Sequence, residues 1–379
     1  MRRAYLVIVI VSAFISAATI NAVMFDTKIH ELRETLKLEY KRINLIEPDR
    51  ILIGRAIAIA EELISSINKS AIPEEMRGTY LESTELLSKA KTGTSWDSLI
   101  NARKSAVDAR MILAYGEVKR GELTKDRILK ERAILDKKLK EIESSTSYHC
   151  SDLSGCIPYS EVEESIYSAI KWLDQIDQLE PIFKTSKERA LIYAAGSIEA
   201  AEGNLDDAEY LLKQISRTEK RLDGSRYIDS VYRKLSKNVE LEIQKCSDIN
   251  GTFAEQTCKE AVGYYERGVE KFKLGLKASS IVDVIAAKAL LGCVDDMLKI
   301  PDPWNSSAVD SKSIYGAKLS AVSSVNRASS KIAAMVAEED IKAGDKLVKR
   351  IIETGRSGEA ANLAYALYLR AAGVANLKI

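Results

Sequence analysis

The residue types that perform most enzyme catalysis are scarce in this chain. Only two histidines, His30 and His149, occur in 379 residues, which leaves no HExxH metal-binding helix and little room for a histidine-based triad. No GxxxxGK[ST] phosphate loop and no GxGxxG loop after a strand is found. Adjacent acids such as Asp206 and Asp207 point about 100° apart on a helix, so a single pair forms a poor acid–base site. We therefore expect no enzymatic activity, no cofactor and no metal ion.

Cysteines are the other reactive residues, and four of the five form two local pairs in predicted loops: Cys150 with Cys156, and Cys246 with Cys258. In an oxidising compartment each pair can close a short disulfide loop, worth about 2–3 kcal/mol. The alternative is a metal site built from His149, Cys150 and Cys156, but the spacing of the thiols and the lack of a fourth ligand fit zinc poorly. Cys293 lies among apolar helical residues and is expected to be a buried free thiol.

The N-terminus predicts export. Arg2 and Arg3 precede an uncharged segment, residues 4–25, which Asp26 ends. As a helix this segment would be about 33 Å long, close to the roughly 30 Å hydrocarbon core of a bilayer. The positive-inside rule then keeps the N-terminus in the cytoplasm and places the main domain outside. We expect a single-pass membrane protein; the alternative is cleavage of the segment as a signal peptide, which would secrete the same domain.

Three Asn-X-Ser/Thr sequons, at Asn68, Asn250 and Asn305, lie at predicted helix ends or loops. A glycan can be accommodated at such positions because it needs an exposed asparagine. They are candidate glycosylation sites of an exported domain.

The composition restricts the fold class and the partners. Hydrophobic residues make up 46% and charged residues 29%, which excludes disorder and a polytopic membrane bundle. Only 6 Pro and 19 Gly occur, too few for an all-β sandwich or barrel. The formal net charge is +1, so no nucleic-acid partner is expected. The composition predicts an all-α protein.

Apolar periodicity predicts helices through almost the whole chain. In residues 96–120, apolar side chains repeat at the alternating spacing of a coiled-coil seam, and residues 128–145 carry a similar seam after Gly121. We expect these two helices to form a long antiparallel hairpin. Ser160 and Glu163 resemble a capping box that starts the next helix. The loop near residue 147 divides the predicted domains: 1–25 (anchor or signal peptide), 26–147 (helical domain with the hairpin) and 148–379 (repeat-like domain).

Residues 187–217 resemble a tetratricopeptide repeat, a helix–turn–helix unit of 34 residues. Gly196 takes the small position of the first helix, Gly203 begins the turn, and Ala208 takes the small position of the second helix. A fainter copy at residues 264–290 places Gly268 and Gly275 at the same offsets. The resemblance implies stacked antiparallel helix pairs. The alternative is that glycine and alanine mark close crossings in an ordinary helical array.

These observations predict an N-terminal transmembrane helix followed by an array of antiparallel helix pairs. Because stacked pairs present extended concave surfaces, we expect a tethered, non-catalytic scaffold that binds a protein or peptide partner in an envelope-associated complex. One alternative is a sensor or solute-binding ectodomain with an enclosed apolar pocket between helices. An enzyme of unrecognised type would instead need several carboxylates converging in one cleft.

Overall fold

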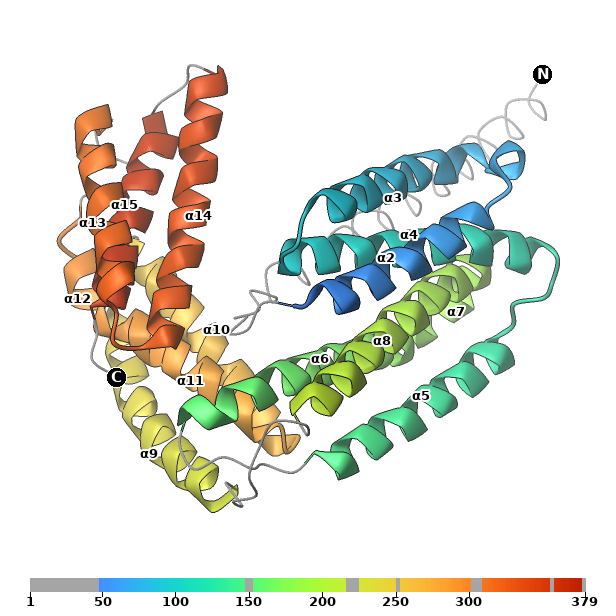
Figure 1. Cartoon of the computed structure of the whole chain (residues 1–379), viewed down its shortest axis with the longest axis horizontal. Helices are drawn as coiled ribbons and strands as arrows, with labels where there is room; N and C mark the ends of the chain where they lie inside the picture. Colours follow the sequence, from blue (N-terminus) through green and yellow to red (C-terminus); the bar gives the residue numbers. More distant parts are fainter. Residues whose placement is uncertain are drawn as a thin grey trace, which may run out of the picture. The chain divides into compact units, whose positions relative to one another are not determined.

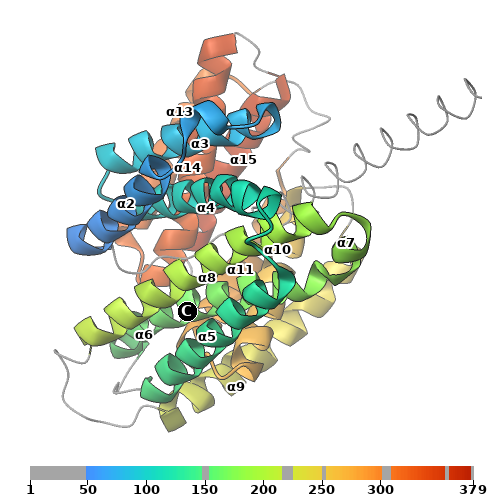
Figure 2. The same cartoon turned by 90° about the vertical axis from the view of Figure 1, so that its right-hand side faces the viewer.

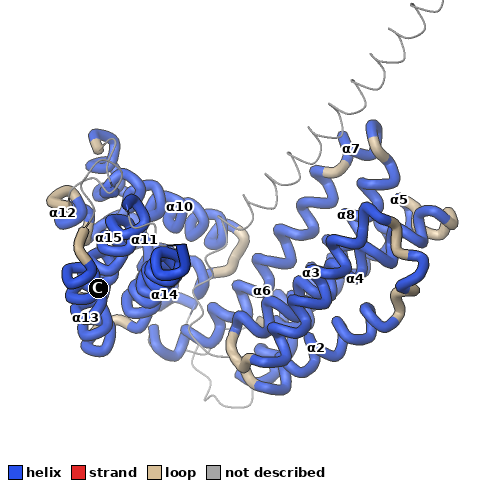
Figure 3. Tube along the Cα trace, turned by 90° about the horizontal axis from the view of Figure 1, so that it is seen from above, coloured by secondary structure: helices blue, strands red, loops and turns tan. Residues whose placement is uncertain are grey.

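The computed structural model describes residues 48–146, 153–215, 225–249, 253–300, 309–354 and 358–376. Every regular element in these ranges is a helix (Figure 3), which confirms the all-α prediction. None of the helices in the described ranges is long and apolar enough to cross a membrane. The predicted anchor, residues 4–25, lies outside the described residues.

The helices of the first half are α2 (Arg50–Ser65), α3 (Glu74–Thr92), α4 (Trp96–Lys119), α5 (Lys125–Ser145), α6 (Leu153–Gln178), α7 (Glu180–Thr185) and α8 (Lys187–Ile215). Those of the second half are α9 (Ser225–Ile243), α10 (Phe253–Lys273), α11 (Lys277–Gly292), α12 (Val294–Met297), α13 (Ser311–Arg327), α14 (Lys331–Thr354) and α15 (Gly358–Ala375). Two short 3₁₀ turns, Lys69–Ala71 and Gln244–Asp248, follow α2 and α9.

Successive layers of helices run through the described residues between 48 and 376. In the first half, α2 and α3 pack on α4, α4 packs on α8, and α8 packs on α6 (Figure 1). The buried face of α4 is rich in small residues, including Ala102, Ala106 and Ala109. Small side chains let neighbouring backbones approach closely, so α4 can contact helices on several sides.

The prediction that α4 and α5 pack together as an antiparallel hairpin is wrong. The two helices follow each other in the chain, but α8 lies against both of them, and α4 and α5 hardly touch (Figures 1 and 2). The alanine seam of α4 is occupied by α2, α3 and α8. The seam of α5 consists of Ile128, Leu135 and Ile142, and it packs on α8 instead. Both seams were recognisable in the sequence, but the partner of each was not.

The helix–turn–helix expected at residues 187–217 is also not formed, because α8 is continuous through Gly203 and Asn204. A Cβ on Gly196 would lie 2.8 Å from Met111 Cγ, and one on Gly203 would lie 2.9 Å from Arg103 Nη1. Both glycines therefore give room to side chains of α4. Ala208 is completely buried on the same helix. The alternative interpretation, close crossings in a helical array, describes α8 correctly.

The fainter copy, in contrast, is a real helix pair. Gly275 lies in the turn between α10 and α11 with φ = +84°, a conformation that favours glycine. A Cβ on Gly268 would lie 2.9 Å from Val284 Cγ2 and 3.1 Å from the Ser280 carbonyl oxygen. Gly268 thus allows the close crossing of α10 and α11, while Gly275 allows the turn.

The start of α6 differs from the predicted capping box. The helix begins at Leu153, so Ser160 and Glu163 lie inside it, and both side chains are buried. Helices from both sides of the predicted boundary after residue 147 pack together, since α8 contacts α4 and α5 as well as α6. On its other side α6 packs against α11.

The second half contains the largest hydrophobic cluster, to which α9, α10, α11, α14 and α15 all contribute. Residues of α11 are buried around almost its whole circumference, as expected for a central helix. The last three helices, α13, α14 and α15, pack mainly on one another. Asn362 and Arg370, the polar residues of α15, are buried rather than exposed to lipid or water.

Candidate functional site

The disulfide expected between Cys246 and Cys258 is present, with 5.9 Å between the Cα atoms. It links the 3₁₀ turn after α9 to the first turns of α10. Cys156 is also disulfide-bonded, and its expected partner Cys150 lies outside the described residues. Cys293 is free and buried, as predicted, and burial raises the pKa of its thiol to about 12.

Of the three sequons, only Asn68 falls within the described residues. Its side chain is exposed and accepts hydrogen bonds from the Ser70 amide at 3.2 Å and the Ser70 hydroxyl at 2.8 Å. Asn250 and Asn305 lie outside the described ranges.

A buried ionic cluster joins α6, α10 and α11. Lys271 of α10 has no exposed side-chain surface; it pairs with Glu164 of α6 and, at 2.7 Å, with Asp283 Oδ2 of α11. Arg267, one turn earlier on α10, donates two hydrogen bonds to Asp283, at 2.9 and 2.7 Å. Burial raises the pKa of Asp283, but the charges of Arg267 and Lys271 outweigh it and hold that pKa below its ordinary value. The aspartate is therefore ionised and its charge is compensated.

Glu163, beside this cluster, caps the start of α11. The N-cap residue of α11 is Leu276, whose side chain cannot accept a hydrogen bond. Glu163 Oε2 instead accepts from the Ser279 amide at 2.7 Å. A carboxylate near a helix N-terminus bonds an amide that has no partner in the helix and interacts favourably with the helix dipole. This explains why a glutamate is buried in the middle of α6.

A second buried ionic cluster lies nearer the N-terminal end of α10. Arg370 of α15 donates to Asp340 of α14, and its Nη1 is 2.9 Å from Glu260 Oε2 of α10. Burial lowers the pKa of Arg370, but Asp340 and Glu260 outweigh this and raise it above its ordinary value. On α10, residues Thr257, Glu260, Tyr264, Arg267 and Lys271 lie at helical spacing. These five residues form a stripe, called here the α10 polar stripe, which connects the two ionic clusters.

The α10 polar stripe does not form a reaction site with open access. The side chains of Lys271, Glu164 and Asp283 are at most 7% exposed, and each carboxylate is paired. The buried charges of the stripe are neutralised by opposite charges on neighbouring helices. These ion pairs determine how α6, α11, α14 and α15 pack against α10. This stripe was not predicted from the sequence, in which the spacing of polar residues on one face of residues 257–271 was the only signal for it.

A third polar group lies between α4 and α8. Arg103 pairs with Asp207, which is buried within α8. Glu199, two turns earlier on α8, is half-buried. Burial, reinforced by the charge of Glu202, raises the pKa of Glu199 to about 7, against the opposing effect of Arg103 and Arg110. This carboxyl group therefore titrates close to neutral pH.

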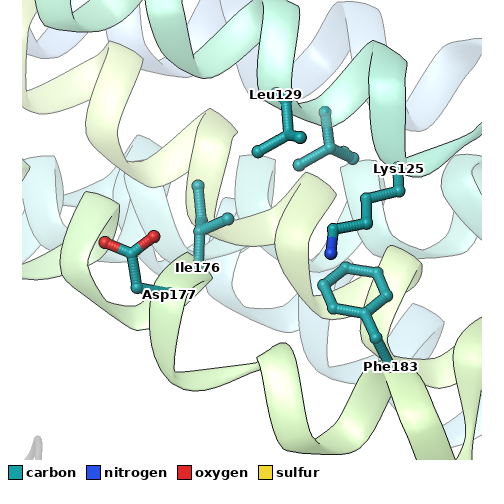
Figure 4. A pocket seen from close by; sticks show the side chains of 6 residues that line it. Lys125, Leu129, Ile176, Asp177 and Phe183 are labelled. Atoms are coloured by element: carbon teal, nitrogen blue, oxygen red, sulfur yellow. The ribbon is translucent and has the colours of Figure 1, made fainter.

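An accessible cavity of about 220 Å³ lies between α5 and the α6–α7 connection (Figure 4). Its apolar wall consists of Ile128 and Leu129 of α5 together with Ile176 and Phe183. Lys125 and Asp177 lie at opposite ends of the view in Figure 4. Lys125 Nζ is 5.2 Å from the centre of the Phe183 ring, and Asp177 pairs with Arg132 of α5. We call this cavity the α5 pocket.

The comparisons with known proteins give one match. The model of a domain of unknown function, DUF8262, matches residues 54–221, from within α2 to just beyond α8. The α5 pocket lies in this similar region, and α9 to α15 follow it. No curated protein and no solved structure matches the chain.

Proposed function

We propose that this protein is a membrane-tethered, extracytoplasmic and non-catalytic helical scaffold, and that the α5 pocket receives an apolar side chain of a protein or peptide partner. The observation that supports this proposal is the pocket's apolar wall, bordered by the cation Lys125 and by the ion pair of Asp177 with Arg132. Such a pocket can hold one apolar anchor residue and orient the flanking peptide groups by charge.

The size of the pocket favours a side chain over a complete small molecule. Its volume of about 220 Å³ is below the roughly 300–1,000 Å³ typical of small-molecule sites. The alternative, a solute-binding ectodomain, needs a larger and more enclosed cavity. Three buried carboxylates, Glu164, Asp283 and Glu163, are bound by Lys271, by Arg267 and by the start of α11, which supports a structural role for them.

The attachment of α5 also supports a binding role. Its buried residues form a single narrow stripe at seven-residue spacing, and its main helical neighbour is α8. Leu129, at the edge of the α5 pocket, is 45% exposed. A helix that contacts the protein through one narrow face leaves its other faces exposed. Apolar side chains on such exposed faces are typical of protein interfaces.

Photo-crosslinking at the pocket tests this proposal. A photoreactive amino acid replaces Leu129 in the full chain, and a second variant carries it at Leu81 on α3, which is 66% exposed and lies away from the pocket. After irradiation in solubilised native membranes, we expect one reproducible adduct from position 129 and none from position 81. Excess wild-type chain should compete with this adduct.

The competition experiment has a matched control. Excess Leu129→Glu chain should fail to compete because a charge blocks the apolar pocket, whereas excess Leu81→Glu chain should compete like the wild type. Equal competition by both variants, or equal adducts from both positions, would contradict binding at the α5 pocket.

A further inference from the structure

The helix α9 carries a row of exposed cations opposite its buried face. Ile228, Tyr232 and Val239 form its buried face, which packs on α10 and α11 (Figure 1). Four cations lie on the opposite face at positions i, i+7, i+8 and i+11: Arg226, Arg233, Lys234 and Lys237. All four are exposed, and together they extend for about 16 Å along the helix. We call these four residues the α9 basic row.

The carboxylates of α9 are bound by neighbouring helices. Asp229 lies 2.8 Å from Lys277 Nζ of α11. Glu242 pairs with Lys288 of α11, and Glu240 accepts a hydrogen bond from Tyr265 of α10. Two of the three acids, Asp229 and Glu242, are therefore paired with lysines of α11, whereas the exposed Glu240 is bound by a neutral tyrosine hydroxyl and forms no ion pair with the basic row.

Ion pairs between residues one turn apart occur on other helices: Lys89 pairs with Glu85, and Lys259 pairs with Glu255. Within the described part of the chain, no ion pair is formed by any member of the α9 basic row. Closely spaced like charges repel each other, and binding of an anion relieves that repulsion.

The surface at the row is hollowed. A shallow depression of about 550 Å³ is lined by Arg226, Asp229, Ser230, Arg233 and Lys234. Asp229, its one carboxylate, is paired with Lys277, so the depression is predominantly positive. A flat membrane surface would contact only the rim of such a depression, whereas carboxylate side chains on a protruding segment can enter it.

We infer that the α9 basic row binds an acidic segment of a partner protein. Carboxylates spaced along that segment contact the row, and Arg226, Arg233 and Lys234 surround one of them in the depression. This surface is separate from the α5 pocket, and the inference does not depend on the proposed use of that pocket.

Binding of a labelled oligoglutamate peptide to the full chain in neutral detergent tests the inference. The wild-type chain is compared with the triple variant Arg226→Gln, Arg233→Gln and Lys234→Gln. A matched control carries Lys69→Gln, Lys104→Gln and Lys312→Gln, three exposed lysines on other elements, and has the same net charge. Fluorescence anisotropy is measured at low and at high salt.

We expect the α9 variant to bind the peptide about tenfold more weakly than the wild type, and the control to differ less than twofold. The wild-type affinity should fall with salt more steeply than that of the α9 variant. Leu129→Glu should bind the peptide like the wild type, which separates this surface from the α5 pocket. Equal loss in the α9 variant and the control would overturn the inference, because binding would then follow net charge alone.

A second arm tests lipid as the ligand. Sedimentation with phosphatidylserine vesicles and with phosphatidylcholine vesicles is compared for the wild-type chain and the α9 variant, with all chains folded as judged by circular dichroism. Binding to phosphatidylserine that depends on the row, without binding of oligoglutamate, would overturn the inference in favour of a lipid surface. Oligoglutamate binding that depends on the row, with no such vesicle dependence, supports it.

Discussion

Lys271 has no exposed surface, and its ammonium group is held between two carboxylates from different helices. Burying three charges costs solvation free energy, which their mutual attraction returns only when the geometry is complete. Asp283 also pairs with a second cation, Arg267. Among the described residues, Glu164 pairs with Lys271. Loss of Lys271 therefore affects the two carboxylates unequally.

We predict that Lys271→Met lowers the free energy of unfolding by about 3–5 kcal/mol, because Glu164 would be left buried without a compensating charge. Adding Glu164→Gln to this variant should recover part of the loss, since Asp283 keeps Arg267. Urea denaturation followed by circular dichroism measures both effects. As a control, Lys91→Met removes a similar contact with Glu61, whose two side chains are 48% and 49% exposed, and should cost at most about 1 kcal/mol. Similar costs for the two lysines would show that the cluster does not stabilise the fold.

Glu199 makes stability depend on pH. Its pKa is about 7 in the folded chain against 4.5 for the ordinary group, so the folded state retains the proton that the unfolded state has lost. This carboxyl group thus stabilises the fold at low pH, and the contribution is lost as pH rises from about 4.5 to about 7. The loss is on the order of 3 kcal/mol. Burial also raises the pKa values of Glu143 and Asp174, so these two carboxyl groups change stability in the same direction.

We predict that Glu199→Gln removes this decline and makes the protein more stable than the wild type at pH 8. The measurement is urea denaturation of both proteins from pH 5 to pH 8. Glu62→Gln, an exposed substitution on α2, should leave the pH profile unchanged. A wild-type stability that stays constant or rises over this interval would contradict the raised pKa of Glu199.

At the scale of elements, the close crossing of α10 and α11 depends on the absence of a Cβ atom at Gly268. Gly268 lies against Val284 and the Ser280 backbone, whereas Gly263 on the same helix has no atom within 4 Å of the position of a Cβ. We predict that Gly268→Ala lowers the free energy of unfolding by about 1–3 kcal/mol because the helices must separate. Gly263→Ala should instead stabilise by up to about 1 kcal/mol through helix propensity. Chemical denaturation of both variants measures this contrast, and equal effects would exclude a close crossing at Gly268.

The two repeat-like segments show what the sequence could and could not predict. Glycine and alanine spacing marked the helix faces that pack closely, and Gly275 correctly marked a turn. The same spacing could not distinguish a turn at Gly203 from a close contact with Arg103, because a glycine permits both. Whether Gly203 forms a turn or a close contact is decided by α4, which lies about a hundred residues earlier in the chain.

The α5 pocket and the α9 basic row also depend on tertiary partners. The apolar wall of the pocket comes from three helices. In the part of the chain that the structure describes, the row lacks ion-pair partners because α10 and α11 bind the acids of α9.

At the scale of the whole molecule, α6 connects the region similar to the family of unknown function with the helices that follow it. One side of α6 packs on α8, and the other packs on α11. Its polar residues Glu163 and Glu164 depend on α10 and α11 for their partners. Val162, just before these residues, and Ile166, just after them, have no exposed surface. Separating the two halves would expose both apolar surface and uncompensated charge.

This arrangement predicts that the region from α2 to α15 unfolds in one cooperative transition, although its length exceeds that of most two-state domains. Leu99→Ala in α4 and Leu290→Ala in α11 each remove a buried side chain and should each cost about 2–5 kcal/mol. In calorimetry of the full chain, we expect both variants to lower the temperature of the same single transition. If α6 instead belonged to one independent domain, two transitions would appear, and each variant would shift only its own. A single shared shift would therefore indicate that the apolar and charged contacts of α6 couple the two halves during unfolding.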